Sequence, residues 1–194
     1  KTKNKRTQKE TYQTRQSNNM DQEKVEKLVS EILKEIGEDP EREGLKETPK
    51  RVAKSFNKLF GGYNMDPQET LTTFDGENYD EMIICKDIDF YSNCEHHIQP
   101  FFGTVSIGYI PNKKIIGLSK LPRLVEVYSR RLQNQERLTM QIAEALDNLL
   151  APKGVAVVIK AKHLCTMARG VEKQNSTMVT SSCRGLFKKK QKTR

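Results

Sequence analysis

The side chains of this sequence best suited to metal chemistry are three histidines and four cysteines, and they are unevenly distributed. All three histidines and two of the cysteines lie in two short segments, Phe90–His97 and His163–Cys165. Imidazole and thiolate are the ligands that a borderline-soft cation such as zinc prefers. Because packing alone does not explain such a concentration of scarce residue types, we expect a metal-dependent enzyme.

The spacing within the two segments suits a single metal ion. Cys94 and His97 stand three residues apart, so one tight loop can direct both side chains at one ion. His163 and Cys165 stand two apart, and strand periodicity predicts that they lie on the same face. Two thiolates and one imidazole would leave zinc an open fourth position, as catalytic sites require. A fourth ligand, His96 or His163, would instead close a structural site, and spacing does not decide between the two.

The remaining cysteines, Cys85 and Cys183, lie in apolar or small-residue stretches that resemble strands. A small buried hydrophobic role is the expected one for both. This pattern favours reduced thiols over two disulfides. The sequence starts at Lys1, which leaves open whether a targeting segment precedes it, and what is present contains no apolar run long enough to span a bilayer or to serve as a signal sequence. We therefore expect a soluble, cytoplasmic protein with no membrane partner.

The formal charge of +9 comes from the two ends of the chain. Residues 1–19 carry six Lys or Arg and one Glu, and residues 184–194 carry six Lys or Arg and no acid, so residues 20–183 carry −2. Basic excess confined to polar ends is typical of solvated, disordered segments. We expect a disordered basic arm at 1–19, a basic tail at 188–194 and no specific nucleic-acid partner.

An N-terminal helical region is predicted over residues 20–62. Apolar residues between Val25 and Ile36 recur at three- and four-residue spacing, which predicts a helix that Gly37 can end. Thr48-Pro49 then supplies an N-cap and a first-turn proline for a second helix, which ends at Gly61-Gly62.

The catalytic domain is predicted over residues 63–187, with α+β structure. Strands are expected at 82–90, 103–110 and 154–161, with a last one at 176–187, and Lys114–Gly117 is expected to start a return strand after a turn at Pro111-Asn112. Two helices are expected between them, at 120–131 and 136–150, the second capped by Asn134. Two strands, two helices and two strands (ββααββ) predict an antiparallel sheet with a helix pair.

Five motifs together resemble one known family. They are Cys94-Glu-His-His97, Gly117-Leu-Ser-Lys120, Arg131–Thr139, His163-Leu-Cys165 and Arg169-Gly170. Their order and spacing are similar to those of GTP cyclohydrolase I, over about Asp21 to Phe187.

The resemblance implies the tunnelling fold, whose subunits join into a ring with active sites between them. Members of the family convert GTP and water to 7,8-dihydroneopterin triphosphate and formate, the entry to folate and tetrahydrobiopterin synthesis. The implied assembly is a homodecamer of two stacked pentameric rings. A regulatory protein is a further partner that the resemblance leaves open.

Roles follow residue by residue from the same resemblance. Cys94, His97 and Cys165 look like the ligands of Zn²⁺, which lowers the pKa of its water toward neutrality and so supplies a nucleophile. His96 and His163 look like the acid/base pair, because imidazoles titrate near neutral pH.

Substrate contacts are also implied by the resemblance. Glu136, with Gln135 beside it, is expected to bind guanine, because a carboxylate can accept from both N1–H and the exocyclic amine. The residues that resemble the family's triphosphate contacts are Lys120, Arg123 and Arg169, with Ser119 adjacent.

Two other classes of protein compete with this interpretation. Another tunnelling-fold enzyme, such as a pterin synthase or nitrile reductase relative, would share the subunit architecture but place its metal or nucleophile elsewhere. A zinc-stabilised nucleic-acid binder would use the basic ends, but aromatic residues are only 7% of the chain and tryptophan is absent, which leaves little for base stacking.

Overall fold

The structure is a computed structural model that describes residues 20–189. The predicted arm at 1–19 and residues 190–194 of the predicted tail lie outside the described residues. The chain divides into two compact units between Lys54 and Ser55. The predicted boundary after residue 62 lies further along the chain and stays a prediction. Within residues 20–189 no helix is both long enough and apolar enough to cross a membrane.

The N-terminal unit contains the first predicted helix, α1 (Gln22–Glu35). Asp21 caps it by accepting a hydrogen bond from Lys24 N at 3.0 Å, and Gly37 follows its end with a φ of +89°, a conformation that glycine adopts without strain. No residue of α1 is buried in the single chain. The second predicted helix is α2 (Thr48–Leu59), in which Pro49 occupies the first turn.

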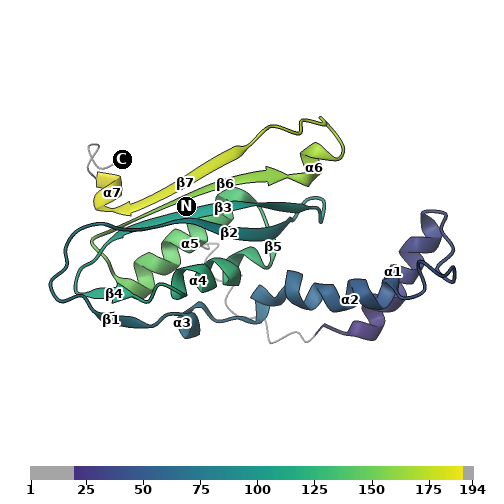
Figure 1. The fold of residues 1–194 in the computed structure, drawn as a ribbon, viewed down its shortest axis with the longest axis horizontal. Helices are drawn as coiled ribbons and strands as arrows, with labels where there is room; N and C mark the ends of the chain where they lie inside the picture. Colours follow the sequence, from purple (N-terminus) through teal and green to yellow (C-terminus); the bar gives the residue numbers. More distant parts are fainter. Residues whose placement is uncertain (1–19, 190–194) are drawn as a thin grey trace, which may run out of the picture. The chain divides into compact units, whose positions relative to one another are not determined.

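The second unit is organised around a five-stranded sheet in the order β5-β2-β3-β6-β7 (Figure 1). Its long strands β2 (Ile83–Cys94), β3 (Pro100–Ile110), β6 (Gly154–His163) and β7 (Met178–Gly185) pair antiparallel in that order. The two-residue strand β5 (Leu132–Gln133) runs parallel to β2 at Asn93 and Cys94. The predicted antiparallel sheet is confirmed, and β2 extends to Cys94 itself.

Two helices cover one face of this sheet, as Figure 1 shows. Helix α4 (Lys120–Ser129) packs on β2, and α5 (Gln135–Leu150) packs on β6 and β7. Asn134 caps α5 as predicted, because its side chain accepts from Arg137 N at 2.8 Å. The buried core lies between the layers, with residues such as Phe101, Leu124 and Ile142 fully enclosed. The predicted α+β order of two strands, a helix pair and two strands is confirmed.

The predicted return strand at Lys114–Gly117 does not pair with β3. Strand β4 (Lys114–Ile116) instead pairs antiparallel with β1 (Thr73–Asp75) in a separate two-stranded sheet. The main-chain N–H of Ile116 donates instead to the hydroxyl of Tyr109 at 3.1 Å. The other short elements are η2 (Gly61–Asn64), α3 (Pro67–Thr70), α6 (Leu164–Met167) and α7 (Leu186–Lys189).

Candidate active site

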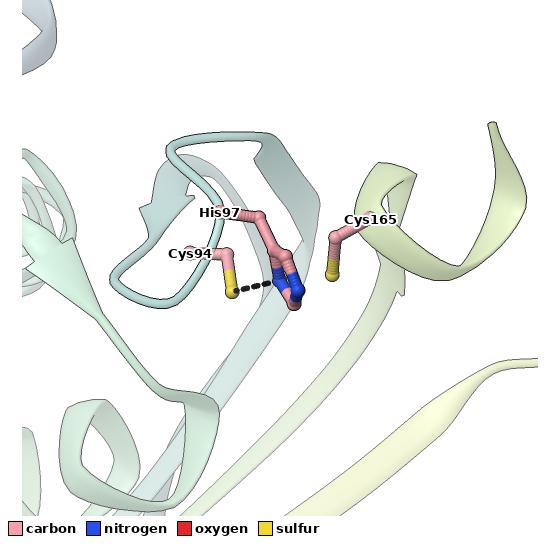
Figure 2. A group of neighbouring side chains, drawn as sticks. All are labelled: Cys94, His97 and Cys165. Atoms are coloured by element: carbon pink, nitrogen blue, oxygen red, sulfur yellow. Dashed lines mark hydrogen bonds between the residues drawn. The ribbon is translucent and has the colours of Figure 1, made fainter. Parts of the chain in front are cut away.

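Three of the predicted metal ligands lie together in the structure. The ligand atoms of Cys94, His97 and Cys165 are all within 4.8 Å of one another, and their side chains point toward a common point (Figure 2). Both cysteines are 7% exposed, whereas His97 is exposed to solvent. The arrangement therefore has two buried sulfurs and one accessible imidazole, a donor set that suits zinc.

A tight turn between β2 and β3 supplies the first two members of this group. The main-chain oxygen of Cys94 accepts from His97 N at 3.3 Å and from Ile98 N at 2.8 Å, and Cys94 N donates to Gln99 O at 2.8 Å. The turn brings Nδ1 of His97 to 3.7 Å from Sγ of Cys94. One tight turn thus directs Cys94 and His97 at the same place, as their three-residue spacing predicts.

Cys165 reaches the group by a different route from the one that strand periodicity predicts. Strand β6 ends at His163, and Cys165 lies in the single helical turn α6 that follows. Ala168 N closes this turn by donating to Leu164 O at 2.9 Å. The prediction that His163 and Cys165 share a strand face is wrong, because the chain changes from strand to helix between them.

The electrostatics of the group favour a cation. Burial raises the pKa of the Cys165 thiol, and the nearby Cys94 raises it further, while Arg169 lowers it. Two thiolates side by side repel each other, and a divalent cation between them removes that repulsion. The residues present therefore fit a zinc ion, with Cys94, His97 and Cys165 as its ligands.

His96 and His163, the alternative fourth ligands, lie differently. His96 is exposed, with Nδ1 at 3.8 Å from Cys94 Sγ and Nε2 at 3.8 Å from Glu95 Oε1. His163 is partly buried and directs its Nε2 to Gln135 Oε1 at 2.8 Å. Among residues 20–189 the metal-binding group contains neither histidine. This geometry favours the three-ligand interpretation over a closed structural site.

The ring of His163 is enclosed on one face by an aromatic residue. Phe101 is its register partner on β3, and the two rings stack with centroids 4.6 Å apart and planes 1° apart. Burial lowers the pKa of His163, and the negative charge of Glu136 partly opposes that shift. Glu136 is therefore close enough for its charge to act on this imidazole.

Glu95, inside the Cys94–His97 motif, ties the metal turn to the start of α5. Its carboxylate accepts from Asn134 Nδ2 at 2.9 Å and from the guanidinium of Arg137. The hydrogen bond from Arg137 is the main reason why the pKa of Glu95 is lowered. Arg137 also donates through Nε to Gln133 Oε1 at 2.9 Å, and Glu95 N donates to Gln133 O at 3.0 Å. Sequence reasoning did not single out Glu95 or Arg137.

Comparisons with known proteins identify the family to which these features belong. The family model described as GTP cyclohydrolase I matches residues 25–194. The chain belongs to the GTP cyclohydrolase I family. The GTP cyclohydrolase 1 of Wolinella succinogenes is 57% identical over 171 residues, which cover 88% of this chain and 91% of that protein. That of Leptospira biflexa is also 57% identical over 171 residues, with 88% and 93% covered. The family predicted from the five motifs is confirmed.

The substrate residues expected for a GTP cyclohydrolase I fall into two groups within one chain. Gln135 and Glu136 begin α5 beside His163, and Arg169 is close enough to Cys165 for its charge to act on that thiol. Ser119 lies instead just before α4, where it lines a cavity of about 810 Å³ together with Cys85 and Asp89 of β2. No member of the metal group lines this cavity.

Lys120 and Arg123 belong to the same end of α4 as Ser119. The chain that follows the opposite end of α4 lies beside the metal end of β2, because Ser92 Oγ donates to Arg131 O at 3.4 Å and β5 pairs with Asn93 and Cys94. Asp89 and Cys94 are five positions apart along β2, a distance of roughly 16 Å at the usual strand rise. One chain therefore keeps Ser119, Lys120 and Arg123 apart from its own metal group.

Proposed function

We propose that this chain catalyses the conversion of GTP and water to 7,8-dihydroneopterin triphosphate and formate, the first step of folate and tetrahydrobiopterin synthesis. The observation that carries the proposal is the identity of more than half of its residues with curated GTP cyclohydrolase 1 proteins over nearly nine tenths of the chain. The gathering of Cys94, His97 and Cys165 supports it independently.

Zinc is the proposed metal, held by Cys94, His97 and Cys165. A bound zinc ion acidifies a water molecule and thereby supplies a nucleophile near neutral pH. The exposure of His97 beside two buried thiols supports a site that a substrate can approach. The purine ring is opened by two hydrolyses, of which the second releases formate.

His96 and His163 are the proposed acid/base pair. His96 is exposed next to the metal group, so its imidazole can give a proton to the guanine ring as the ring is opened. His163 lies between Phe101 and Gln135 and is assigned to the later proton transfers of the ribose rearrangement and ring closure. These steps need proton transfers but no redox cofactor.

The remaining roles concern substrate binding. Glu136 is proposed to accept from N1–H and the exocyclic amine of guanine, a pairing that adenine cannot offer. Its proximity to His163 supports a base pocket at the start of α5. The proposed triphosphate contacts are Ser119, Lys120, Arg123 and Arg169, because forked guanidinium and ammonium groups suit phosphate oxygens.

The assembly proposed is a homodecamer of two stacked pentameric rings, with each site shared between subunits. The separation of Lys120 and Arg123 from the metal group within one chain supports sharing. A cytoplasmic location and a regulatory protein partner remain part of the proposal.

The test is incubation of the purified, zinc-loaded chain with GTP, followed by assay of formate and of a fluorescent pterin after oxidation. We expect both products, and ATP should yield neither. His96→Ala should retain about one zinc per chain while formate release is abolished. Loss of zinc from His96→Ala would show that ligand and acid/base residue are wrongly assigned.

A pair of cysteine variants tests the metal assignment with a matched control. Cys165→Ser should lose zinc and activity together, since it removes one of the two sulfurs of the group. Cys183→Ser removes a thiol on β7 that lies outside the group, and it should keep both. Equal zinc content in the two variants would contradict the proposed site.

A further inference from the structure

Gln135, the first residue of α5, is almost completely buried, with 1% of its surface exposed. Its side-chain nitrogen Nε2 lies 3.1 Å from each of three oxygen atoms on the sheet. These are the main-chain oxygens of Ile159 and Met178 and the hydroxyl of Thr180. The amide of Gln135 is therefore held between the helix and strands β6 and β7.

These contacts fix which way the amide points. A main-chain carbonyl can only accept a hydrogen bond, so the group facing Ile159 O and Met178 O must be the donor Nε2. The hydroxyls agree with this orientation, because Thr139 Oγ1 donates to Gln135 O at 2.7 Å and therefore accepts from Thr180 Oγ1 at 2.7 Å. Thr180 Oγ1 is then free to accept from Gln135 Nε2.

The orientation of the Gln135 amide determines the tautomer of the neighbouring His163. With Nε2 of Gln135 turned to the sheet, its Oε1 faces Nε2 of His163 at 2.8 Å. An amide oxygen cannot donate, so Nε2 of His163 must carry the hydrogen. In the neutral imidazole the lone pair is then on Nδ1. Stacking on the fully buried Phe101 fixes the plane of the ring.

We propose that Gln135 is a positioning residue that holds His163 as the Nε2–H tautomer and so makes Nδ1 the nitrogen that exchanges protons during the reaction. Because protein groups already occupy both ends of its amide, Gln135 acts through His163 and not on the guanine itself. The inference rests on the proposed function in giving His163 a proton-transfer role.

The tautomer is measured directly by ¹⁵N NMR of the zinc-loaded wild-type protein. The chain has only three histidines, and His163→Asn identifies the signals of His163 by their loss. We expect His163 to show a protonated Nε2, whose hydrogen exchanges slowly with water, and an unprotonated Nδ1. A protonated Nδ1 with a bare Nε2 would overturn the proposal. This measurement needs no variant of Gln135 and no turnover.

Kinetics then test whether Gln135 acts on catalysis or on binding. Gln135→Leu should lower kcat by about 10- to 100-fold, as loss of a residue that orients a functional histidine typically does, with KM for GTP and zinc content little changed. Asn148→Leu is the matched control, since Asn148 is an exposed residue of the same helix and lies more than three turns away from Gln135. It should keep its kcat. A raised KM at unchanged kcat in Gln135→Leu would place the side chain on the base and overturn the proposal.

A double variant shows whether the effect passes through His163. Adding Gln135→Leu to His163→Asn should cause no further loss of kcat, whereas independent roles would multiply the two losses. Multiplied losses would refute a positioning role. If the wild-type chain does not turn over GTP at all, the proposed function fails, while the NMR result still decides the tautomer.

Discussion

The carboxylate of Glu95 lies between two parts of the site that are far apart in the sequence. It follows Cys94 directly, yet its partners Asn134 and Arg137 belong to the start of α5. Arg137 in turn bonds Gln133, whose strand pairs with the end of β2. A metal turn fixed in this way has its ligands in place before an ion arrives, which strengthens metal binding.

The first prediction at the scale of single residues concerns Arg137. Arg137→Met keeps much of the side-chain volume but removes the guanidinium that holds Glu95, so zinc affinity should fall by roughly 10-fold, the lower end of the range for outer-sphere partners. Competition with a chromogenic chelator measures this affinity without reference to turnover. Arg130→Met is the control, because Arg130 bonds Glu126 on α4. Equal zinc affinity in both variants would show that Glu95 needs no such support.

At this scale the sequence predicts the proposed metal-binding side chains but not the residues that hold them in place. Cys94 and His97 could be predicted as a pair because their spacing is local. The link from Glu95 to Arg137 spans 42 residues, and no periodicity predicts such a contact. The two-sided contacts of Gln135 could likewise not be predicted, because its partners lie on two other elements, β6 and β7, at least 24 residues further along the chain.

The elements that carry the site depend on one close approach between strands. Gly103 on β3 is paired with Ala161 on β6 and Phe90 on β2. A Cβ added at Gly103 would lie 1.9 Å from Lys160 O and 2.8 Å from Ala161 Cα. Both are backbone atoms, so the strands themselves would have to separate. This sheet leads into the Cys94 turn on one strand and into His163 on another.

Gly103→Ala should therefore lower the free energy of unfolding by about 3 kcal/mol, the upper end of the usual range for overpacking. Urea denaturation followed by circular dichroism measures the change. Gly108→Ala on the same strand is the control, because its Cβ would meet no heavy atom closer than 3.8 Å. It should change stability by less than about 1 kcal/mol. Similar midpoints for the two variants would mean that β3 and β6 can adjust at Gly103 without loss.

Most of the elements could be predicted from the sequence, and the exceptions have physical causes. Alternating apolar residues predict β3, a continuous apolar run predicts β6, and apolar residues at helical spacing predict α4 and α5. The pairing of β4 with β1 could not be predicted, since both strands have only three residues and their partners lie about 40 positions apart. The strand-to-helix change before Cys165 could not be predicted for a similar reason, because α6 is a single turn and too short to show a helical period.

The whole chain places its proposed catalytic groups at two ends of one layered unit. Cys94, His97 and Cys165 gather where β2 and β6 end, with His163 and Glu136 nearby. Lys120 and Arg123 begin α4 at the opposite end of β2. In the proposed ring, a triphosphate that must reach both groups would contact Lys120 and Arg123 of a neighbouring copy.

Complementation between inactive variants tests this sharing. His96→Ala and Arg123→Ala should each be nearly inactive alone, but co-expressed chains should regain roughly one quarter of the wild-type rate, because random mixing gives some interfaces both intact residues. Co-expression of His96→Ala with His163→Ala is the matched control, since both residues lie beside the same chain's metal group and no interface can combine them. Rescue in neither mixture would place Arg123 and His96 in one subunit's site, and rescue in both would show that His96 and His163 also come from different chains.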